Sequence, residues 1–204
     1  DGDIDLYVVN LQSINFLYQN DGDPDESGQV TFSRITTGRV YSDPSWSRGC
    51  SWSDYDNDGD LDLFVTSNGD NYLYQNNRDG SFTRITSGDI VEDSRYSYSS
   101  SWGDYDNDGD LDLFVTNVTW DESDNKNFLY RNDGPTGTEG QVIFTRITSG
   151  DIVNNGWESR GSSWVDYDND GDLDLFVANG WSVTQKNDLY RNDGPAAPGG
   201  QVNF

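Results

Sequence analysis

The chain has 204 residues, of which 37 are acidic, 12 are basic and none is histidine, so its formal net charge is −25. This balance argues against nucleic acid as a partner and against membrane insertion or an anionic membrane surface, because nucleic acid and such a surface both need a basic footprint and no run approaches the ~20 apolar residues of a membrane helix. The single cysteine, Cys50, excludes an intrachain disulfide and a cysteine-rich zinc site. Aromatic residues make up 14% of the chain, which favours a folded domain over a disordered acidic one.

Three blocks of sequence recur along the chain and predict four similar units. Residues 51–65 return almost unchanged at 101–115 and 163–177, and the second half of this block opens the chain. A Leu-Tyr block and a Phe-x-Arg-Ile-Thr block follow in each unit, and the chain closes on the first residue of the latter. We therefore predict one repeat array over residues 1–204, with an incomplete first and last unit. The approximate units are 1–38, 46–88, 98–150 and 160–204.

Each complete unit is predicted to hold four short strands and no helix. In the second unit the strands lie around Trp52, over residues 61–65, from Leu73 and from Phe82. In the second strand, Leu61, Leu63 and Val65 point to one face, and Asp62 and Phe64 to the other, because side chains alternate along a strand. Repeats of four strands at roughly 40 to 50 residues or slightly more are typical of propeller blades. The predicted fold is therefore an all-β propeller built from four-stranded antiparallel blades.

An aspartate-rich segment joins the first two strands of each complete unit. We call the three copies the acidic loops (residues 54–62, 104–112 and 166–174). Aspartate fills positions 1, 3, 5, 7 and 9, and glycine at position 6 permits a sharp turn. Oxygen ligands at this density select Ca²⁺ over zinc or copper, with position 7 expected to use its backbone carbonyl. The predicted ligands are Asp54, Asp56, Asp58, Asp60, Asp62, Asp104, Asp106, Asp108, Asp110, Asp112, Asp166, Asp168, Asp170, Asp172 and Asp174.

Two other interpretations of the acidic loops were weighed. An EF-hand needs glutamate at position 12, but that position is Val65 in the first loop and valine in the other two. A solvated acidic turn is the simpler alternative, since Asp-Gly pairs are common in turns. Four side chains at alternating positions would only repel one another without a cation, which favours the metal site.

The Trp-x-Asp-x-Asp-x-Asp-Gly-Asp-x-Asp-Leu pattern resembles the FG-GAP and VCBS repeats of integrin α-subunit propellers and many bacterial secreted proteins. This resemblance implies a β-propeller with calcium in each acidic loop, an extracellular setting and an adhesive or recognition role. Asp1, Asp3 and Asp5 match positions 5, 7 and 9, so they predict a partial fourth calcium site. Positions 1 and 3 of that site precede the chain.

Aromatic residues divide into a repeating and a non-repeating set. Trp52, Trp102 and Trp164 share one register and are predicted to pack between units. The other tryptophans lie in connections that emerge opposite the acidic loops, where they predict a protein or carbohydrate ligand face, although packing between loops would explain them too. These are Trp46, Trp120, Trp157 and Trp181. Asn117-Val118-Thr119 is a glycosylation sequon, which makes Asn117 a candidate acceptor.

The sequence therefore predicts a calcium-binding propeller module, extracellular or on the cell surface, with an adhesive, recognition or structural role. Its predicted partners are a protein or carbohydrate ligand or neighbouring copies of the chain. One alternative is a subunit of an extracellular filament, in which neighbouring chains complete the partial units. Another is a propeller-type carbohydrate-active enzyme, whose carboxylate pair would be sought at Asp121 and Glu122. We do not expect an enzyme, because histidine is absent and the repeated aspartates are assigned to metal.

Overall fold

A computed structural model describes most of the chain. The described residues are 3–23, 27–43, 46–119, 126–136, 141–154, 157–180, 185–195, 199–200, 202 and 204. Strands dominate this part of the chain, so the all-β prediction is confirmed. Within the described residues no helix is long and apolar enough to cross a bilayer.

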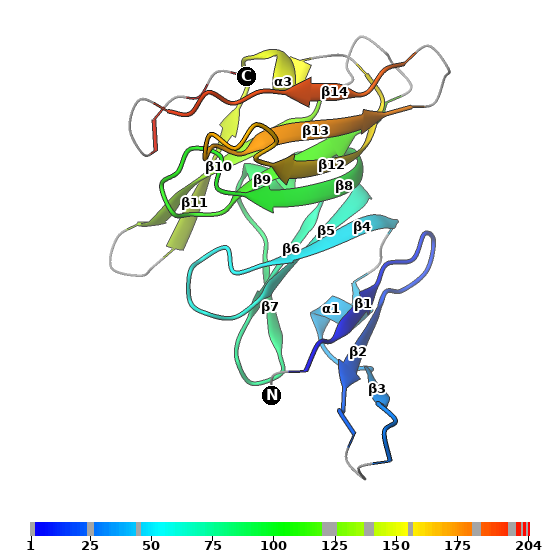
Figure 1. Ribbon diagram of the computed structural model, residues 1–204. Coiled ribbons are helices and arrows are strands. Elements are labelled where there is room, and N and C mark those ends of the chain that lie inside the picture. The colour runs from blue at the N-terminus through cyan, green and yellow to red at the C-terminus, as the bar shows by residue number, and fades with distance from the viewer. Residues whose placement is uncertain are drawn as a thin grey trace.

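The strands form four antiparallel groups that follow one another along the chain (Figure 1). The first group is β1 (Leu6–Val8), β2 (Phe16–Asn20) and β3 (Phe32–Ile35). The second is β4 (Ser47–Ser53), β5 (Asp62–Gly69), β6 (Tyr72–Asn76) and β7 (Phe82–Ile85). The third is β8 (Arg95–Gly103), β9 (Asp112–Asn117), β10 (Phe128–Thr136) and β11 (Gln141–Ile147). The fourth is β12 (Ser159–Val165), β13 (Asp174–Asn179) and β14 (Asp188–Tyr190).

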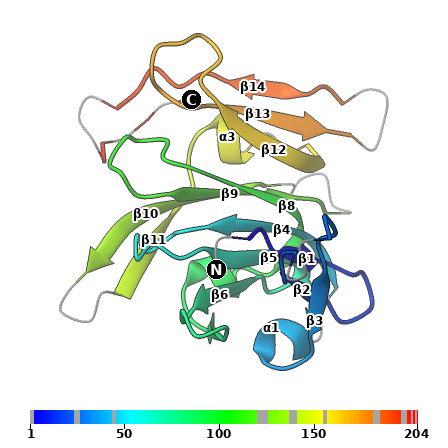
Figure 2. The same cartoon turned by 60° about the horizontal axis from the view of Figure 1, so that its bottom comes forward.

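Successive groups are layered against one another, which gives the molecule a propeller-like arrangement (Figure 2). The first strands of the later groups lie together, since β8 contacts both β4 and β12. The second and third groups are also joined edge to edge, because Asn68 pairs with Tyr96 and Gly69 with Arg95. This short pairing makes one eight-stranded sheet of the two complete units.

Three single-turn helices correct the prediction that the units contain no helix. They are α1 (Arg39–Ser42), α2 (Asp89–Glu92) and α3 (Asp151–Asn154), and each lies in the crossover between two units. A glycine with positive φ precedes each one, for example Gly88 at 101°. One turn is too short to show a helical period in the sequence. The turns matter for packing, because α2 buries Ile90 and Val91.

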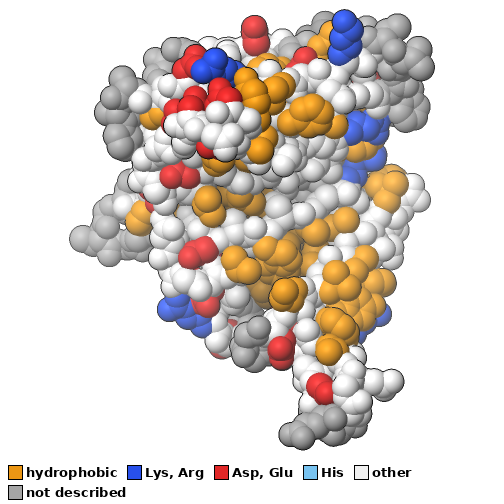
Figure 3. Space-filling model, viewed as in Figure 1, with side chains coloured by type: hydrophobic (Ala, Val, Ile, Leu, Met, Phe, Trp, Pro, Cys, Tyr) orange, Lys and Arg blue, Asp and Glu red, His pale blue; other side chains and the backbone are white. Residues whose placement is uncertain are grey.

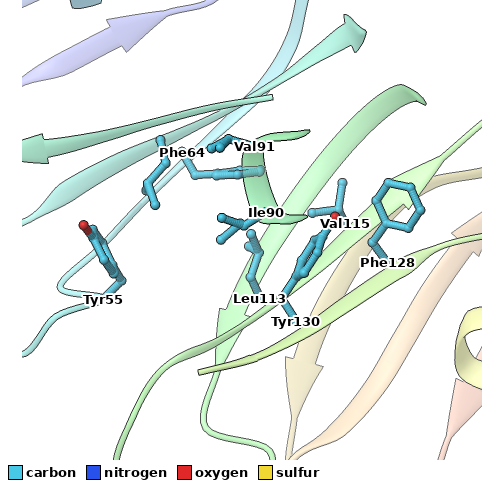
Figure 4. Close-up of a cluster of buried hydrophobic side chains, with 9 residues drawn as sticks. Tyr55, Phe64, Ile90, Val91, Leu113, Val115, Phe128 and Tyr130 are labelled. Carbon is cyan, nitrogen blue, oxygen red and sulfur yellow. The ribbon is translucent and has the colours of Figure 1, made fainter. Parts of the chain in front are cut away.

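A hydrophobic core fills each gap between successive groups. Because side chains alternate along a strand, the second strand of a unit contributes to two of these cores. Leu63 and Val65 of β5 face the core shared with the first group, whereas Phe64 faces the core shared with the third. Figure 4 shows Phe64 among side chains from α2 and the third group. The predicted alternation is therefore confirmed for these three residues. Leu61 is an exception, because it precedes β5 and is 57% exposed.

The repeating tryptophans pack between units, as predicted. The Trp102 ring lies edge-on to Phe64 and stacked on Tyr55, both from the preceding unit. Its Nε1 donates to Ser51 Oγ at 2.9 Å. A Cβ added at Gly103 would lie 2.8 Å from the Trp164 ring. The first strands of neighbouring units thus approach so closely that glycine is required there.

A carboxylate, buried at Asp43 and half-buried at Asp93, joins each complete unit to the crossover before it. Asp93, which caps α2, accepts from Tyr130 Oη at 2.9 Å and from Arg146 Nη1 at 2.8 Å. Asp43 is held in the same way by Tyr74 and Arg84, at 3.0 and 3.2 Å. The repeated arginines of β7 and β11 are therefore ion-pair partners of acidic residues.

We expect Asp93→Ala to lower the free energy of unfolding by about 2 kcal/mol, because it leaves a buried tyrosine hydroxyl and an arginine without their acceptor. Urea unfolding measures the change. Asp89→Ala removes the same charge from the exposed start of α2 and should cost less than about 0.5 kcal/mol. Equal losses in the two variants would contradict this account of the contact.

Candidate metal sites

Each acidic loop is folded around its first aspartate. In the loop between β4 and β5, Asp54 accepts the backbone N–H of Asp58 at 2.9 Å and that of Gly59 at 3.0 Å. Asn57 and Gly59 take positive φ values of 57° and 93°, which turn the chain back on itself. Asp104 and Asp166 make the equivalent pairs of bonds, so all three acidic loops share one conformation.

The ninth loop position anchors each acidic loop to the sheet. Asp112 is buried and accepts the backbone N–H groups of Asn132 at 2.8 Å and Tyr105 at 3.0 Å. Asn132 in turn donates its side-chain N–H to Leu111 O at 3.2 Å and to Tyr55 O, in the preceding acidic loop, at 2.8 Å. This contact is not predictable from the local sequence. Its signal was the Asn that ends the Leu-Tyr block in every unit, at Asn20, Asn76, Asn132 and Asn192.

The structure brings three carboxylates together in each acidic loop. Oxygens of the three groups lie within 4.8 Å of one another. Ca²⁺ binds oxygens at about 2.3–2.6 Å, so two ligands of one ion lie at most about 5 Å apart. The groups are Asp54, Asp56 and Asp58; Asp104, Asp106 and Asp108; and Asp166, Asp168 and Asp174.

The carboxylates at position 7 lie outside these three groups. Asp110 accepts from Asn57 Nδ2 of the preceding acidic loop at 2.6 Å, and Asp172 accepts from Asn107 at the same distance. Asp60 is paired with Arg78. Position 7 therefore uses its side chain to tie loops together, which leaves its backbone carbonyl as the group available to a metal.

Several buried carboxylate oxygens have no hydrogen-bond donor within the described part of the chain. They are Asp56 Oδ1, Asp62 Oδ2 and both oxygens of Asp106. Asp106 is fully buried. Buried oxygens without donors are costly unless a cation satisfies them. The donor set thus fits a hard divalent cation, and the loop of the third unit fits it best.

Burial and crowding raise the carboxyl pKa values in these loops. Burial, followed by the charges of Asp108 and Asp104, raises the pKa of Asp106 to about 6. Burial also raises the pKa of Asp62 to about 7, and that of Asp112 to about 9 despite its backbone donors. Without a cation these sites therefore retain protons that free aspartate would lose.

Comparison with known families agrees with this repeated geometry. The family model of the FG-GAP-like repeat matches residues 1–65 and 54–115, which together span residues 1–115 of the 204. The chain belongs to the FG-GAP-like repeat family. Both matches end at the same place in the repeat, at Val65 of β5 and Val115 of β9. No curated protein matches the chain.

The three FG-GAP-like loops differ in the side chains that border their carboxylates. Arg191 contacts Asp168 at 3.1 Å and Asp170 at 3.9 Å, so a guanidinium already lies beside the acidic loop 166–174. In the first loop, Gln75 donates to Asp56 Oδ2 at 2.6 Å. These neighbours come from the Leu-Tyr block of each unit and were not predicted from the sequence. The acidic loop 104–112 is therefore the most open to a cation, since neither carboxylate oxygen of Asp106 has a hydrogen-bond donor among the described residues.

The remaining predicted positions are only partly described. Asp5 accepts the backbone N–H of Asn20 at 2.8 Å, which is the contact that position 9 makes elsewhere. Asp3 lies close to Gly22, and Asp1 lies outside the described residues. Trp46 and Trp157 are 49% and 39% exposed. Trp120 and Trp181, and with them Asp121 and Glu122, lie outside the described residues.

Asn117, the predicted glycosylation acceptor, lies inside the fold. Asn117 ends β9 and is fully buried. Its Oδ1 accepts from Ser97 Oγ and its Nδ2 donates to Lys126 O, both at 2.9 Å. Asn179, at the same place in the next FG-GAP-like repeat, donates to Lys186 O in the same way. The residue therefore holds the following connection, and its amide is not accessible to a glycan.

We expect the protein to be less stable at pH 8 than at pH 5 when a chelator removes metal. Asp106 and Asp62 have pKa values of about 6 and 7 in the folded chain, against about 3.9 in an unfolded one. The folded state then binds more protons, so stability falls as pH rises from about 4 through about 7. Thermal unfolding in EDTA tests this, and Asp106→Asn should reduce the fall. A midpoint that rises over this range would contradict it.

Proposed function

We propose that the three acidic loops bind Ca²⁺ and that the ions hold a β-propeller of four-stranded blades together. The observation that carries this proposal is Asp106, whose two carboxylate oxygens are buried without a donor between Asp104 and Asp108. Each ion would rest on the side chains at positions 1, 3, 5 and 9 and on the carbonyl at position 7. It would supply charge neutralisation, since three ions would reduce the formal charge from −25 to −19.

We further propose that this module acts outside the cell or at its surface, in adhesion or recognition. Two features support this. Extracellular calcium modules bind at about 10⁻⁴ to 10⁻³ M, and exposed loops rich in aspartate suit that range. Membership of the FG-GAP-like repeat family is compatible with an interaction module. The face opposite the acidic loops, which carries the exposed Trp46, would then meet the partner.

Calcium should raise the thermal midpoint of unfolding. At a calcium concentration about fifty times Kd, binding to the folded state alone contributes about 2 kcal/mol per site. Calorimetric scans in calcium and in EDTA measure the difference. Magnesium at the same concentration should stabilise less, because it keeps most of its waters. Identical midpoints in calcium and EDTA would refute the proposal.

Two substitutions in one acidic loop should separate its positions. Asp106→Asn removes a proposed ligand charge and should abolish about one calcium site per chain or weaken it tenfold or more. Asp110→Asn makes the same charge change but keeps an oxygen that can accept from Asn57, so it should weaken binding much less. Titration calorimetry gives the stoichiometry and affinity. Equal effects would show that the positions are assigned wrongly.

A further inference from the structure

The face opposite the acidic loops is built from positions that differ between units. The first strands start there, and the serines Ser47, Ser97 and Ser159 point inward and are buried. Arg48, Tyr98 and Arg160, one residue further on, occupy equivalent positions four residues before the repeating tryptophans. The positions immediately before the three serines are also equivalent, and they hold Trp46, Tyr96 and Glu158. Because these side chains vary between units that otherwise repeat, the fold of the unit does not require them.

A stack across three units is formed by Arg48, Tyr98 and Arg160. The Arg48 guanidinium carbon lies 4.2 Å from the Tyr98 ring centre, and that of Arg160 lies 4.5 Å from it. Arg160 is further held by Gly180 O and Glu158. Arg48 donates from Nε to Asn68 Oδ1 at 2.6 Å. This contact and the ring fix the direction of its planar guanidinium.

The chain has 37 acidic residues, but none of those that the structure describes pairs with Arg48. Within the described ranges no carboxylate lies within ion-pair distance of it. By contrast, Arg84 of β7 and Arg146 of β11 are both paired with carboxylates. An oriented guanidinium without a counter-charge is a binding group for a carboxylate from outside the chain.

A shallow groove adjoins this arginine. It has a volume of ≈ 540 Å³ and is lined by Trp46, Asn68, Gly69, Ser94, Arg95 and Tyr96. Trp46 and Tyr96 are 49% and 43% exposed. The strand pairing of Asn68 with Tyr96 and the bond from Asn68 N to Trp46 O bring the two aromatic residues to either side of Asn68. Arg48 is not itself a lining residue, but its hydrogen bond to Asn68 places the guanidinium next to the groove.

We propose that this surface binds an acidic saccharide of the uronate type. A pyranose ring would stack on the exposed ring of Trp46 or Tyr96, its hydroxyls would meet the polar groups of Asn68 and Ser94, and its carboxylate would pair with Arg48. Flat aromatic rings beside hydrogen-bonding groups suit a sugar, whose faces are apolar and whose edges are polar. Figure 3 shows Lys and Arg side chains next to hydrophobic ones at the right edge of this view. The proposal names a ligand class for the proposed recognition role, but it does not depend on calcium.

The test uses the whole chain in calcium with a hyaluronan hexasaccharide as the uronate probe, measured by titration calorimetry. We expect binding that falls at least tenfold in Arg48→Gln and in Trp46→Ala. Arg48→Lys keeps the charge without the planar fork and should lose affinity as well. Arg39→Gln, which makes the same charge change at a side chain that is 69% exposed on α1, should bind as the unchanged chain does.

Three controls decide between outcomes. Carboxyl-reduced hyaluronan should bind at least tenfold more weakly, and equal binding would overturn the role of Arg48. Polyglutamate that binds as tightly as the hexasaccharide would show a surface for an acidic protein and would overturn the saccharide. Failure of the unchanged chain to bind the hexasaccharide would also overturn it. Unfolding midpoints in calcium show whether each variant is folded, and a calcium-dependent midpoint without sugar binding would leave the calcium proposal standing.

Discussion

The buried carboxylate at the ninth loop position is the contact on which the rest of each unit depends. In the third unit, Asp112 lies at the start of β9 and takes backbone donors from its own loop and from the middle of β10. A buried charge must be satisfied from several sides, so this one residue fixes where the acidic loop, β9 and β10 meet. Asn132 extends the arrangement to the preceding unit through Tyr55 O. The geometry of the acidic loops and the stacking of units are therefore set by the same few bonds.

This arrangement explains how a chain of low hydrophobic content can be well packed. Each unit contributes only one apolar strand face to each neighbour, as Phe64 and Leu63 do on opposite sides of β5. Neither face is buried unless the next unit is present, which is the energetic pattern of repeat proteins. Fifteen of the 37 acidic residues lie in the three acidic loops, where their repulsion is local. A cation in each loop would remove that repulsion without any change in the cores.

The sequence predicted features that repeat and act locally, and it missed those that depend on contacts between units. The period, the strand alternation around Phe64 and the turn at Gly59 follow from neighbouring residues alone. The role of Asn132 depends on a carbonyl 77 residues earlier in the chain. The turn α2 forms because its apolar residues pack into a core between units, which no local period reveals. Asn117 looked like a surface acceptor because a sequon carries no information on burial.

Comparing the units with one another distinguishes residues that the fold needs from candidate recognition residues better than exposure alone does. A residue present in every copy, such as the asparagine equivalent to Asn132, is explained by a contact that every copy makes. Trp46 and Arg48 have different residues at the equivalent places in the third unit, yet both are oriented by Asn68, on the strand that joins the two complete units. The junction itself thus differs from a plain repeat, and its Arg48 has no ion-pair partner among the described residues. A repeat array gains a specific surface in this way, because the shared frame positions side chains that it does not itself need.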